Sequence, residues 1–366
     1  MVIGILGGGQ LGRMLALAGY ELGLRFRFLD PSPDAPAGHV GDLVVGDYLD
    51  PAAVDRFAAG CEVITYEFEN VPVEAVKKLA ARLPVYPPVR ALEVGQDRIA
   101  EKTLFASLGL EVPAFRAVGS SVELRAAARE IGLPAVLKTR RMGYDGKGQA
   151  VIRTEVEMEA AWSRIGEHPG GLILEQMVAF ERELSVISVR ARSGEMQFYP
   201  LIENVHAGGI LSRSAAPAAR VSAALRSRAE SAARAVAAHL NYVGVLTLEL
   251  FQVGERLLIN EMAPRVHNSG HWTIDGSVAG QFENHVRAVA GWPLGSTAMA
   301  AESVVMLNLV GHIPDRAAVL EVPGAHLHLY GKSPRPGRKV GHITIAGSTG
   351  DVKAAEARMA SIVQRS

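Results

Sequence analysis

Short apolar segments alternate with helical patterns at the start of the chain. Runs of strand length occur at Val2–Leu6, Arg25–Leu29, Leu43–Val45 and Glu62–Tyr66, and patterns of helical period occur from Gln10 to about Tyr20 and onward from Pro51 and Val73. Asp50 before Pro51 is a typical N-cap followed by a first-turn proline, which supports the second helix start. Because alternating strands and helices build a parallel sheet with helices on its faces, we predict an α/β domain over residues 1–99.

The remainder of the chain is predicted to mix α and β structure. A proline-rich segment, Pro84–Pro88, closes the first unit, and a helical stretch is expected from about Arg90 to Leu108. Ser120 and Glu123 have the spacing of a capping box at the next helix start. Further strands are expected at Ala135–Thr139, Gln149–Arg153, Leu172–Glu175, Leu184–Arg192, Val245–Phe251 and Leu257–Met262, with a helix at about Ser222–Leu240. We therefore predict an α+β region after the first domain.

Composition and charge narrow the classes of protein. With 366 residues, of which 48% are hydrophobic, the chain can bury two or three cores. Lys plus Arg equals Asp plus Glu at 38 each, so no net field favours nucleic acid or a membrane, and neither is expected as a partner. The single cysteine, Cys61, excludes an internal disulfide and a thiolate zinc cluster. The start lacks the pattern of a signal peptide and no run reaches roughly 20 apolar residues, so a cytoplasmic protein is expected.

A glycine-rich turn follows the first predicted strand. The spacing Gly7-x-Gly9-x-x-Gly12 opens a helix, and Asp30 ends the second strand. Such a turn lets a phosphate approach the helix N-terminus, and an acid at that place can hold a ribose. Three interpretations stay open from these residues: a site for a phosphate-bearing substrate other than a dinucleotide, a site for NAD or FAD, and a tight turn with a purely structural role.

Two further segments are typical of a nucleotide site. Lys138 ends a predicted strand and is followed by Gly143-Tyr144-Asp145-Gly146-Lys147-Gly148-Gln149, a loop whose glycines and cations suit a mobile lid over ATP phosphates. The alternative is a surface hairpin with solvated cations. The segment Glu175-Gln176-Met177-Val178, with Glu183 after it, can present backbone groups to adenine and a carboxylate to ribose, although a plain crossover between lobes explains it as well.

Two acids lie in the long strands on either side of a turn at Gly254. If Gln252 pairs with Arg256, Glu249 and Glu261 share one face of the hairpin as diagonal neighbours at roughly 7–8 Å. Two carboxylates among apolar neighbours are costly to bury unpaired, so they need a cation or face water. Carboxylates, phosphate oxygens and water are the usual shell of Mg²⁺ bound to ATP, so this hairpin is a candidate metal site; a solvated outer face is the alternative.

Two polar segments complete the candidates. The run Asn260–Thr273 is rich in donors, and the spacing of His267 and His271 is conceivable for a metal, but Ser269 and Gly270 argue against a helix there, so anion recognition is favoured. The turn between Tyr330 and His342 carries four cations within eight residues, held by prolines and glycines. It suits a phosphate monoester, with an ordinary basic surface loop as the alternative.

The order of these motifs resembles the ATP-grasp superfamily and, within it, the N5-carboxyaminoimidazole ribonucleotide synthetase family. GGGQLGRM, YEFENVP, QDR, GYDGKGQ, NEMAPRVHNSGHWT and YGKSPRPGRKVGH are similar to that family's signatures. The resemblance implies an α/β and α+β chain of ATP-grasp fold, with an N-terminal Rossmann-like (pre-ATP-grasp) domain at 1–99, an ATP-grasp domain at 100–295 that includes a lid subdomain at about 113–182, and a β-rich C-terminal domain at 296–366. It also implies a homodimeric carbon–nitrogen ligase of de novo purine biosynthesis that uses ATP, Mg²⁺ and bicarbonate to carboxylate 5-aminoimidazole ribonucleotide through carboxyphosphate.

The resemblance further implies roles by position. ATP is expected at Arg98, Lys138, Gly143, Tyr144, Asp145, Gly146, Lys147, Gly148, Gln149, Glu175, Gln176, Met177, Val178, Glu183, His206, Asn260 and Glu261, and Mg²⁺ at Glu249 and Glu261. The ribonucleotide is expected at Gln10, Leu11, Glu67, Asn268, Lys332, Arg335 and Arg338, and the chemistry at Arg265, His267 and Lys332, with the first two beside bicarbonate. Many ATP-grasp proteins have an Asn two residues after the second metal-binding Glu, whereas Ala263 stands there in this chain, so two carboxylates with phosphate oxygens and water are expected to hold the metal.

Other activities remain as alternatives. A formate-using glycinamide ribonucleotide transformylase and a biotin carboxylase share the ATP half of this pattern. An NAD-dependent oxidoreductase and a catalytically silent nucleotide-binding protein lie outside it, and neither needs a pair of metal-binding acids, so the two-carboxylate hairpin counts against both.

Overall fold

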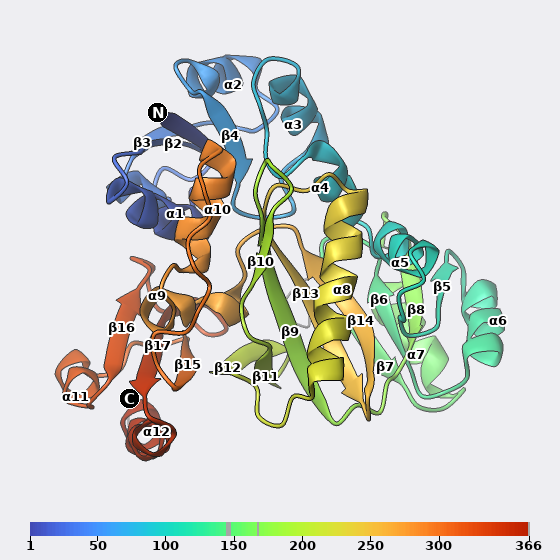
Figure 1. Ribbon diagram of the computed structural model, residues 1–366. Coiled ribbons are helices and arrows are strands. Elements are labelled where there is room, and N and C mark those ends of the chain that lie inside the picture. Colours follow the sequence, from blue (N-terminus) through green and yellow to red (C-terminus); the bar gives the residue numbers. More distant parts are fainter. Residues whose placement is uncertain (144–147, 167, 365–366) are drawn as a thin grey trace.

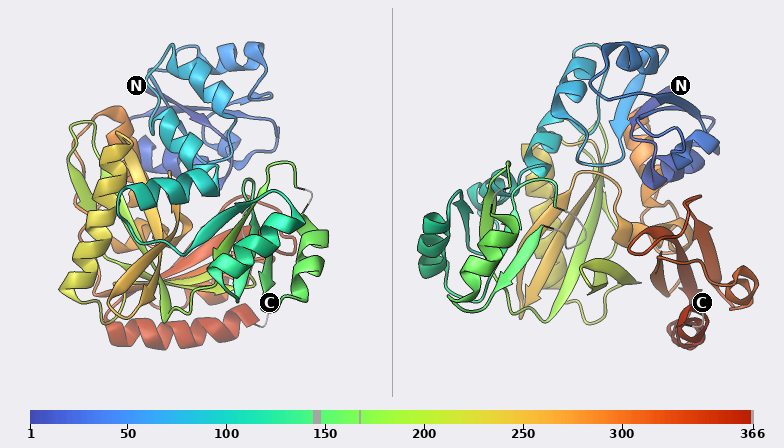
Figure 2. Two further views of the ribbon diagram at one scale, coloured as in Figure 1. Left: turned by 90° about the vertical axis from the view of Figure 1, so that its right-hand side faces the viewer. Right: turned by 180° about the vertical axis from the view of Figure 1, so that it is seen from behind.

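The structure, a computed structural model, describes residues 1–143, 148–166 and 168–364. Figure 1 shows the N-terminal domain above a long central sheet, with a small subdomain on one side and the C-terminal elements on the other. The two further views show the same three parts around the central strands (Figure 2). Within the described ranges, no helix has both the length and the apolar character that a membrane crossing requires.

The N-terminal domain is the predicted parallel α/β unit. Its strands, β1 (Val2–Leu6), β2 (Arg25–Asp30), β3 (Asp42–Val45) and β4 (Val63–Tyr66), pair in parallel in the order β3-β2-β1-β4. Between and after them come α1 (Gln10–Tyr20), the short 3₁₀ helix η1 (Pro36–His39), α2 (Pro51–Ala58), α3 (Val73–Ala80) and α4 (Val89–Gly95). Asp50 caps α2 by accepting from the backbone N–H of Ala52, as the Asp-Pro pair predicts.

The expectation of one helix from about Arg90 to Leu108 was wrong. The structure has two helices there, α4 and α5 (Arg98–Ser107). Asp97 lies between them with an extended backbone, and its side chain accepts from the N–H groups of Ile99 and Ala100 to cap α5. The apolar pattern continues across this break, so periodicity alone did not reveal it.

A small subdomain follows α5. It contains β5 (Phe115–Val118), α6 (Ser121–Ile131), β6 (Ala135–Thr139), β7 (Gln149–Ile152), α7 (Glu157–Ile165) and β8 (Leu172–Gln176). Its four strands pair antiparallel in the order β5-β8-β6-β7, and both helices pack on them through a core of their own. Ser120 caps α6 by accepting from Glu123 N, as the spacing predicts.

The central sheet has nine strands. It contains β9 (Arg182–Arg190), β10 (Met196–Phe198), β11 (Ile202–Ala207), β12 (Ile210–Ala216), β13 (Gly244–Val253), β14 (Arg256–Ala263), β15 (Ser303–Val310), β16 (Ala325–Leu329) and β17 (Lys339–Gly347). The order is β14-β13-β9-β11-β12-β15-β17-β16, with β10 beside β9, so β14 is an edge strand and the C-terminal strands continue the same sheet. Helix α8 (Ala223–His239) covers the apolar face of β9, β13 and β14 (Figure 1).

The remaining helices join the parts. They are the 3₁₀ helix η2 (Asn268–Gly270), α9 (Thr273–Gly276), α10 (Gln281–Ala290), α11 (Arg316–Leu320) and α12 (Thr349–Gln364). Helix α10 lies against α1 of the N-terminal domain (Figure 1). The buried pair Thr65 Oγ1 and His285 Nε2, at 2.9 Å, ties β4 to α10. These contacts fix the N-terminal domain against the central sheet. Residues from both parts can therefore line one cleft.

Candidate active site

A cleft of about 790 Å³ lies where the N-terminal domain, the small subdomain and the central sheet meet. Most of the residues predicted for the site line it. They are Gln10, Leu11, Arg98, Lys138, Gly143, Gln149, Glu175, Gln176, Met177, Val178, Glu183, His206, Glu249, Asn260, Glu261, Arg265, His267 and Asn268. The structure thus brings together segments that are separated by more than half of the chain.

The structure describes the predicted lid loop at Gly143, Gly148 and Gln149. Tyr144, Asp145, Gly146 and Lys147 lie outside the described residues. Gly148 has a φ of +69° and its carbonyl accepts from Thr139 N at 2.7 Å, so it closes the β6–β7 connection. A side chain there would meet Thr139 Oγ1 at 2.7 Å, which is why this position favours glycine.

The end of β8 carries the first charged group of the cleft. Glu175 is 2% exposed, and its Oε2 accepts from Lys138 Nζ at 2.9 Å, with Lys102 Nζ at 3.4 Å. Burial alone would raise the pKa of Glu175, but the two ammonium groups lower it to about 2. Its other oxygen, Oε1, is buried without a partner among the described groups, so an acceptor is left over at the cleft.

Glu183 and His206 form a second pair on the cleft wall. Glu183 lies on β9 and His206 on the neighbouring β11, and His206 Nδ1 contacts Glu183 Oε2. Burial would lower the pKa of His206, but the bond to Glu183 raises it above its ordinary value. A carboxylate that is oriented by a histidine can accept from hydroxyl groups of a ligand.

The two acids of the β13–β14 hairpin face each other across the ladder. Glu249 pairs directly with Glu261, because β14 has one extra residue, Asn260, between the partners of Glu249 and Leu250. The predicted register was wrong: the turn pairs Val253 with Arg256, and this bulge then shifts the pairing by one residue. Both carboxylates still line the same cleft, but as direct neighbours and not as diagonal ones.

Each of these acids has a cationic or imidazole partner. Arg98 Nη1 donates to Glu261 Oε2 at 2.7 Å, and His267 Nε2 lies 2.9 Å from Glu249 Oε1. Ser269 N donates to the other ring nitrogen of His267 at 3.3 Å, so Nε2 carries the proton that Glu249 accepts. Burial would raise the pKa of Glu249, but His267 lowers it to about 2. The carboxylate is therefore anionic at neutral pH.

The donor set fits a metal that arrives with a nucleotide. Over the ranges that the structure describes, no three His, Cys, Asp or Glu side chains gather closely enough to hold a metal on their own. Magnesium is commonly held by one or two carboxylates together with phosphate oxygens and water, and two facing carboxylates match that need. The His267–His271 spacing makes no metal site, because His271 is fully buried and packs against Phe282 and Tyr330.

Arg265 has a carboxylate partner that sequence reasoning missed. Its guanidinium forms a two-point pair with Glu69, including Nη2 to Oε1 at 3.1 Å. Burial would raise the pKa of Glu69, but Arg265 lowers it. The signal for Glu69 was its place just after the buried strand β4, at the carboxyl edge of a parallel sheet, where ligands commonly bind.

Glu67, predicted for the ribonucleotide, lies under the glycine-rich turn. It is 6% exposed, and its carboxylate accepts from the N–H groups of Gly9 and Gly12. These are the groups that a phosphate would use in a dinucleotide site. A carboxylate of the chain itself therefore occupies the anion position of the turn, which removes the physical basis for the NAD or FAD interpretation.

The basic turn lies beside the cleft. Lys332 Nζ donates to Gln10 Oε1 at 2.5 Å and so reaches the wall that Gln10 and Leu11 form. Arg335 is exposed, and Arg338 donates to the carbonyl of Ser333 at 3.2 Å; neither lines the cleft. Asn268, which does line it, is held by reciprocal amide bonds to Asn308 of β15, at 2.8 and 3.2 Å.

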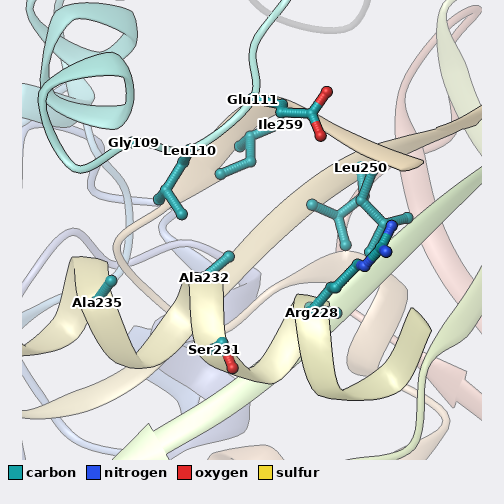
Figure 3. Close-up of a pocket in the computed structure, with 11 residues that line it drawn as sticks. Gly109, Leu110, Glu111, Arg228, Ser231, Ala232, Ala235, Leu250 and Ile259 are labelled. Atoms are coloured by element: carbon teal, nitrogen blue, oxygen red, sulfur yellow. The ribbon is translucent and has the colours of Figure 1, made fainter. Parts of the chain in front are cut away.

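A second hollow (Figure 3) lies on the face of the β13–β14 hairpin that is opposite to the main cleft. It has about 390 Å³ and is bounded by α8, the strands β13 and β14 and the segment after α5. Leu110, Leu250 and Ile259 point into it, with Glu111 and Arg228 at its rim (Figure 3). Because side chains alternate between the two faces of a strand, this hollow is apolar where the main cleft is charged.

The fold and the cleft define an ATP-grasp protein. The ATP-grasp domain family matches residues 103–282, the ribonucleotide synthetase preATP-grasp domain matches residues 1–96, and the phosphoribosylaminoimidazole carboxylase C-terminal domain matches residues 304–357. The chain is an ATP-dependent ligase.

Its relatives identify the family. The chain is 51% identical to the N5-carboxyaminoimidazole ribonucleotide synthase of Pseudomonas aeruginosa over 345 residues, which cover 94% of each protein. The crystal structure of N5-carboxyaminoimidazole ribonucleotide synthetase from Thermus thermophilus superposes with a TM-score of 0.94 at 58% identity over 98% of both chains. The synthase from Aspergillus clavatus in complex with ADP and 5-aminoimidazole ribonucleotide superposes with a TM-score of 0.92 at 29% identity, over 100% of this chain and 99% of that one. The chain belongs to the N5-carboxyaminoimidazole ribonucleotide synthase family.

Proposed function

We propose that this chain carboxylates 5-aminoimidazole ribonucleotide with bicarbonate and ATP, through carboxyphosphate, as a step of de novo purine biosynthesis. The observation that carries the proposal is the direct pairing of Glu249 with Glu261 in the cleft that the segment 175–178 and the Arg265 guanidinium also line. Family membership supports the choice of substrates over formate, glycinamide ribonucleotide or biotin.

The nucleotide end is assigned to the β8–β9 connection. The backbone of the segment 175–178 would receive adenine, and Glu183 would accept from the ribose hydroxyls. Lys138 and Arg98 would face the phosphates. The bonds that now neutralise these cations, to Glu175 and Glu261, keep them oriented in the cleft before the nucleotide arrives.

We assign a magnesium ion to Glu249 and Glu261. When bound, it would offset charge on the transferred phosphoryl group. The phosphate oxygens and water would complete the shell, since the chain itself offers two carboxylates there. His267 and Arg98, which contact these acids, would then be free to turn towards substrate oxygens.

Bicarbonate is assigned to Arg265 and His267. Glu69 holds the guanidinium of Arg265 in one plane, and a planar anion can be bound by the donors that remain. An oxygen of bicarbonate would attack the γ-phosphoryl group in line, with the O–P bond to ADP breaking as the new P–O bond forms. The amine of the ribonucleotide would then take up the carboxyl group as phosphate leaves.

The ribonucleotide is assigned to the wall made by Gln10, Leu11 and Asn268. Lys332, together with Arg335 and Arg338, would hold the phosphate of the ribonucleotide. Burial lowers the pKa of Lys332 in the protein without ligand. Glu67 would act from beneath, by holding the glycine-rich turn. We further propose that the protein acts in the cytoplasm as a homodimer, as family members are expected to.

An ADP-release assay with each acid and nucleotide tests the function. Bicarbonate with 5-aminoimidazole ribonucleotide should support turnover, whereas formate with glycinamide ribonucleotide should not. Turnover with the second pair, or with neither, would contradict the proposed function.

A further inference from the structure

One face of α5 contacts three successive residues of the β14 bulge. Arg98, Glu101 and Lys102 are spaced i, i+3 and i+4, so they lie on the same side of the helix. Lys102 Nζ donates to the Asn260 carbonyl at 2.7 Å, and Glu101 Oε1 accepts from Met262 N at 2.7 Å. Arg98 Nη1 donates to the carboxylate of Glu261, the residue between Asn260 and Met262.

These contacts satisfy groups that the sheet cannot. β14 is an edge strand, and its bulge leaves Asn260 without a cross-strand partner on β13. An unpaired buried N–H or carbonyl costs free energy comparable to a lost hydrogen bond. Glu101 and Lys102 supply the missing partners from the side, which stabilises the chain in its bulged path.

The bulge decides which way Glu261 points. Without the bulge, the register that pairs Leu250 with Ile259 would also pair Leu248 with Glu261. Leu248 is fully buried beneath α8. A slip of one residue turns every side chain to the other face of a strand. The carboxylate would then leave the cleft for the apolar side of the hairpin.

The two side chains are placed for this task at some energetic cost. Lys102 is fully buried and Glu101 is 3% exposed, and buried polar or charged groups are costly unless they are hydrogen-bonded or paired. Lys102 has a second contact, 3.4 Å to Glu175 Oε2, so it joins the β13–β14 hairpin to β8.

We propose that Glu101 and Lys102 are positioning residues that hold the β14 bulge so that Glu261 faces Glu249, and that they thereby set the affinity of the nucleotide complex for its divalent cation. The inference rests on the proposed metal role of Glu249 and Glu261. It assigns to the side of α5 a function in metal affinity that goes beyond stabilising the fold.

The test measures Mn²⁺ binding to the ADP complex by electron paramagnetic resonance, with ADP binding in the absence of metal measured alongside. Lys102→Met and Glu101→Leu should each weaken Mn²⁺ binding by about 10- to 100-fold, the loss typical of groups that orient metal ligands. Glu101→Gln keeps an acceptor for Met262 N and should restore most of that loss. Thr103→Ala, on the exposed face of the same helix, is the matched control and should bind Mn²⁺ like the parent protein.

The outcomes separate this inference from the function on which it rests. If Glu261→Gln weakens Mn²⁺ binding but Lys102→Met and Glu101→Leu lower only the melting temperature, the two residues are structural and the inference is wrong. If Glu261→Gln itself leaves Mn²⁺ binding unchanged, the metal assignment fails first. Equal weakening by Glu101→Leu and Glu101→Gln would also overturn the inference, because the hydrogen bond to the bulge would then not be what matters.

Discussion

Glu249 and Glu261 lie directly opposite each other on β13 and β14, with one extra residue of β14 between this pair and the next. Like charges in this arrangement repel and destabilise a sheet, so their presence requires compensation. Arg98 and His267 supply it in the structure, and the magnesium ion that we propose for the bound nucleotide would supply it during turnover.

Replacement of Glu261 by glutamine should nearly abolish turnover and leave the fold intact. The amide keeps the shape of the side chain but loses the charge that would hold the metal. A barrier raised by about 3 kcal/mol or more corresponds to a hundredfold or greater loss in kcat/KM. ADP release and thermal unfolding should be measured on the same sample. Parental activity would remove the metal assignment, and collapse of the fold would make the residue structural.

Arg265→Lys should weaken the binding of bicarbonate much more than the binding of ATP. Lysine keeps the positive charge but cannot form the two-point pair with Glu69 or grip a planar anion with two donors. We expect the KM for bicarbonate to rise about tenfold or more, while the KM for ATP changes by less than about twofold. Steady-state kinetics in each substrate provide the check. Equal increases in both constants would contradict a role that is specific to bicarbonate.

Glu67→Ala should destabilise the N-terminal domain. The change leaves the buried N–H group of Gly12 and the partly buried N–H group of Gly9 without an acceptor, which should lower the free energy of unfolding by about 2 kcal/mol or more. Glu62→Ala is a matched control, since Glu62 also accepts from a backbone N–H, that of Val2, but at an exposed position. Denaturant unfolding should show a change below about 0.5 kcal/mol for the control. Equal effects in the two variants would mean that burial of the glycine-rich turn does not matter.

Stability should fall as the pH is lowered, because of His285. Burial lowers its pKa from 6.5 to about 4, and its Nδ1 accepts from Val245 N at 3.1 Å, so the folded protein holds this imidazole neutral. The unfolded chain binds the proton more tightly, and stability is therefore lost as pH falls from 6.5 towards 4. The contribution of this one group should be about 2 kcal/mol between pH 7 and pH 5.

The His285 contribution can be isolated by comparing the protein with its His285→Gln variant. Free energies of unfolding measured at both pH values should show a smaller pH dependence in the variant, by about the same 2 kcal/mol. An unchanged pH dependence would mean that another group governs acid stability.

Local patterns could be read from the sequence where local chemistry decides the structure. The helix from Gln10 to Tyr20 and the cap at Asp50 follow from neighbouring residues, and both are found as predicted. The break at Asp97 was missed because the apolar pattern runs through it. The residues of the cleft were predicted from the resemblance of several motifs to one family. The chemistry of any single motif left alternatives open.

Relationships between distant segments could not be read from spacing. The bulge at Asn260 depends on partners from α5, and nothing within the hairpin itself reveals it. The pair between Glu69 and Arg265 joins positions 196 residues apart. In the same way, Glu67 was assigned to a ligand although the structure turns it towards the N–H groups of its own domain.

Transfer of oxygen from bicarbonate to phosphate tests the central claim most directly. With ¹⁸O-labelled bicarbonate, purified protein, Mg-ATP and 5-aminoimidazole ribonucleotide, mass spectrometry of the inorganic phosphate should find one labelled oxygen per turnover, because the attacking oxygen of bicarbonate stays on phosphorus when carboxyphosphate breaks down. The measurement is made on freshly mixed reactions, before bicarbonate exchanges its label with water. Phosphate without label, formed while ADP and carboxylated nucleotide accumulate, would mean that bicarbonate does not attack ATP and would contradict the proposed reaction.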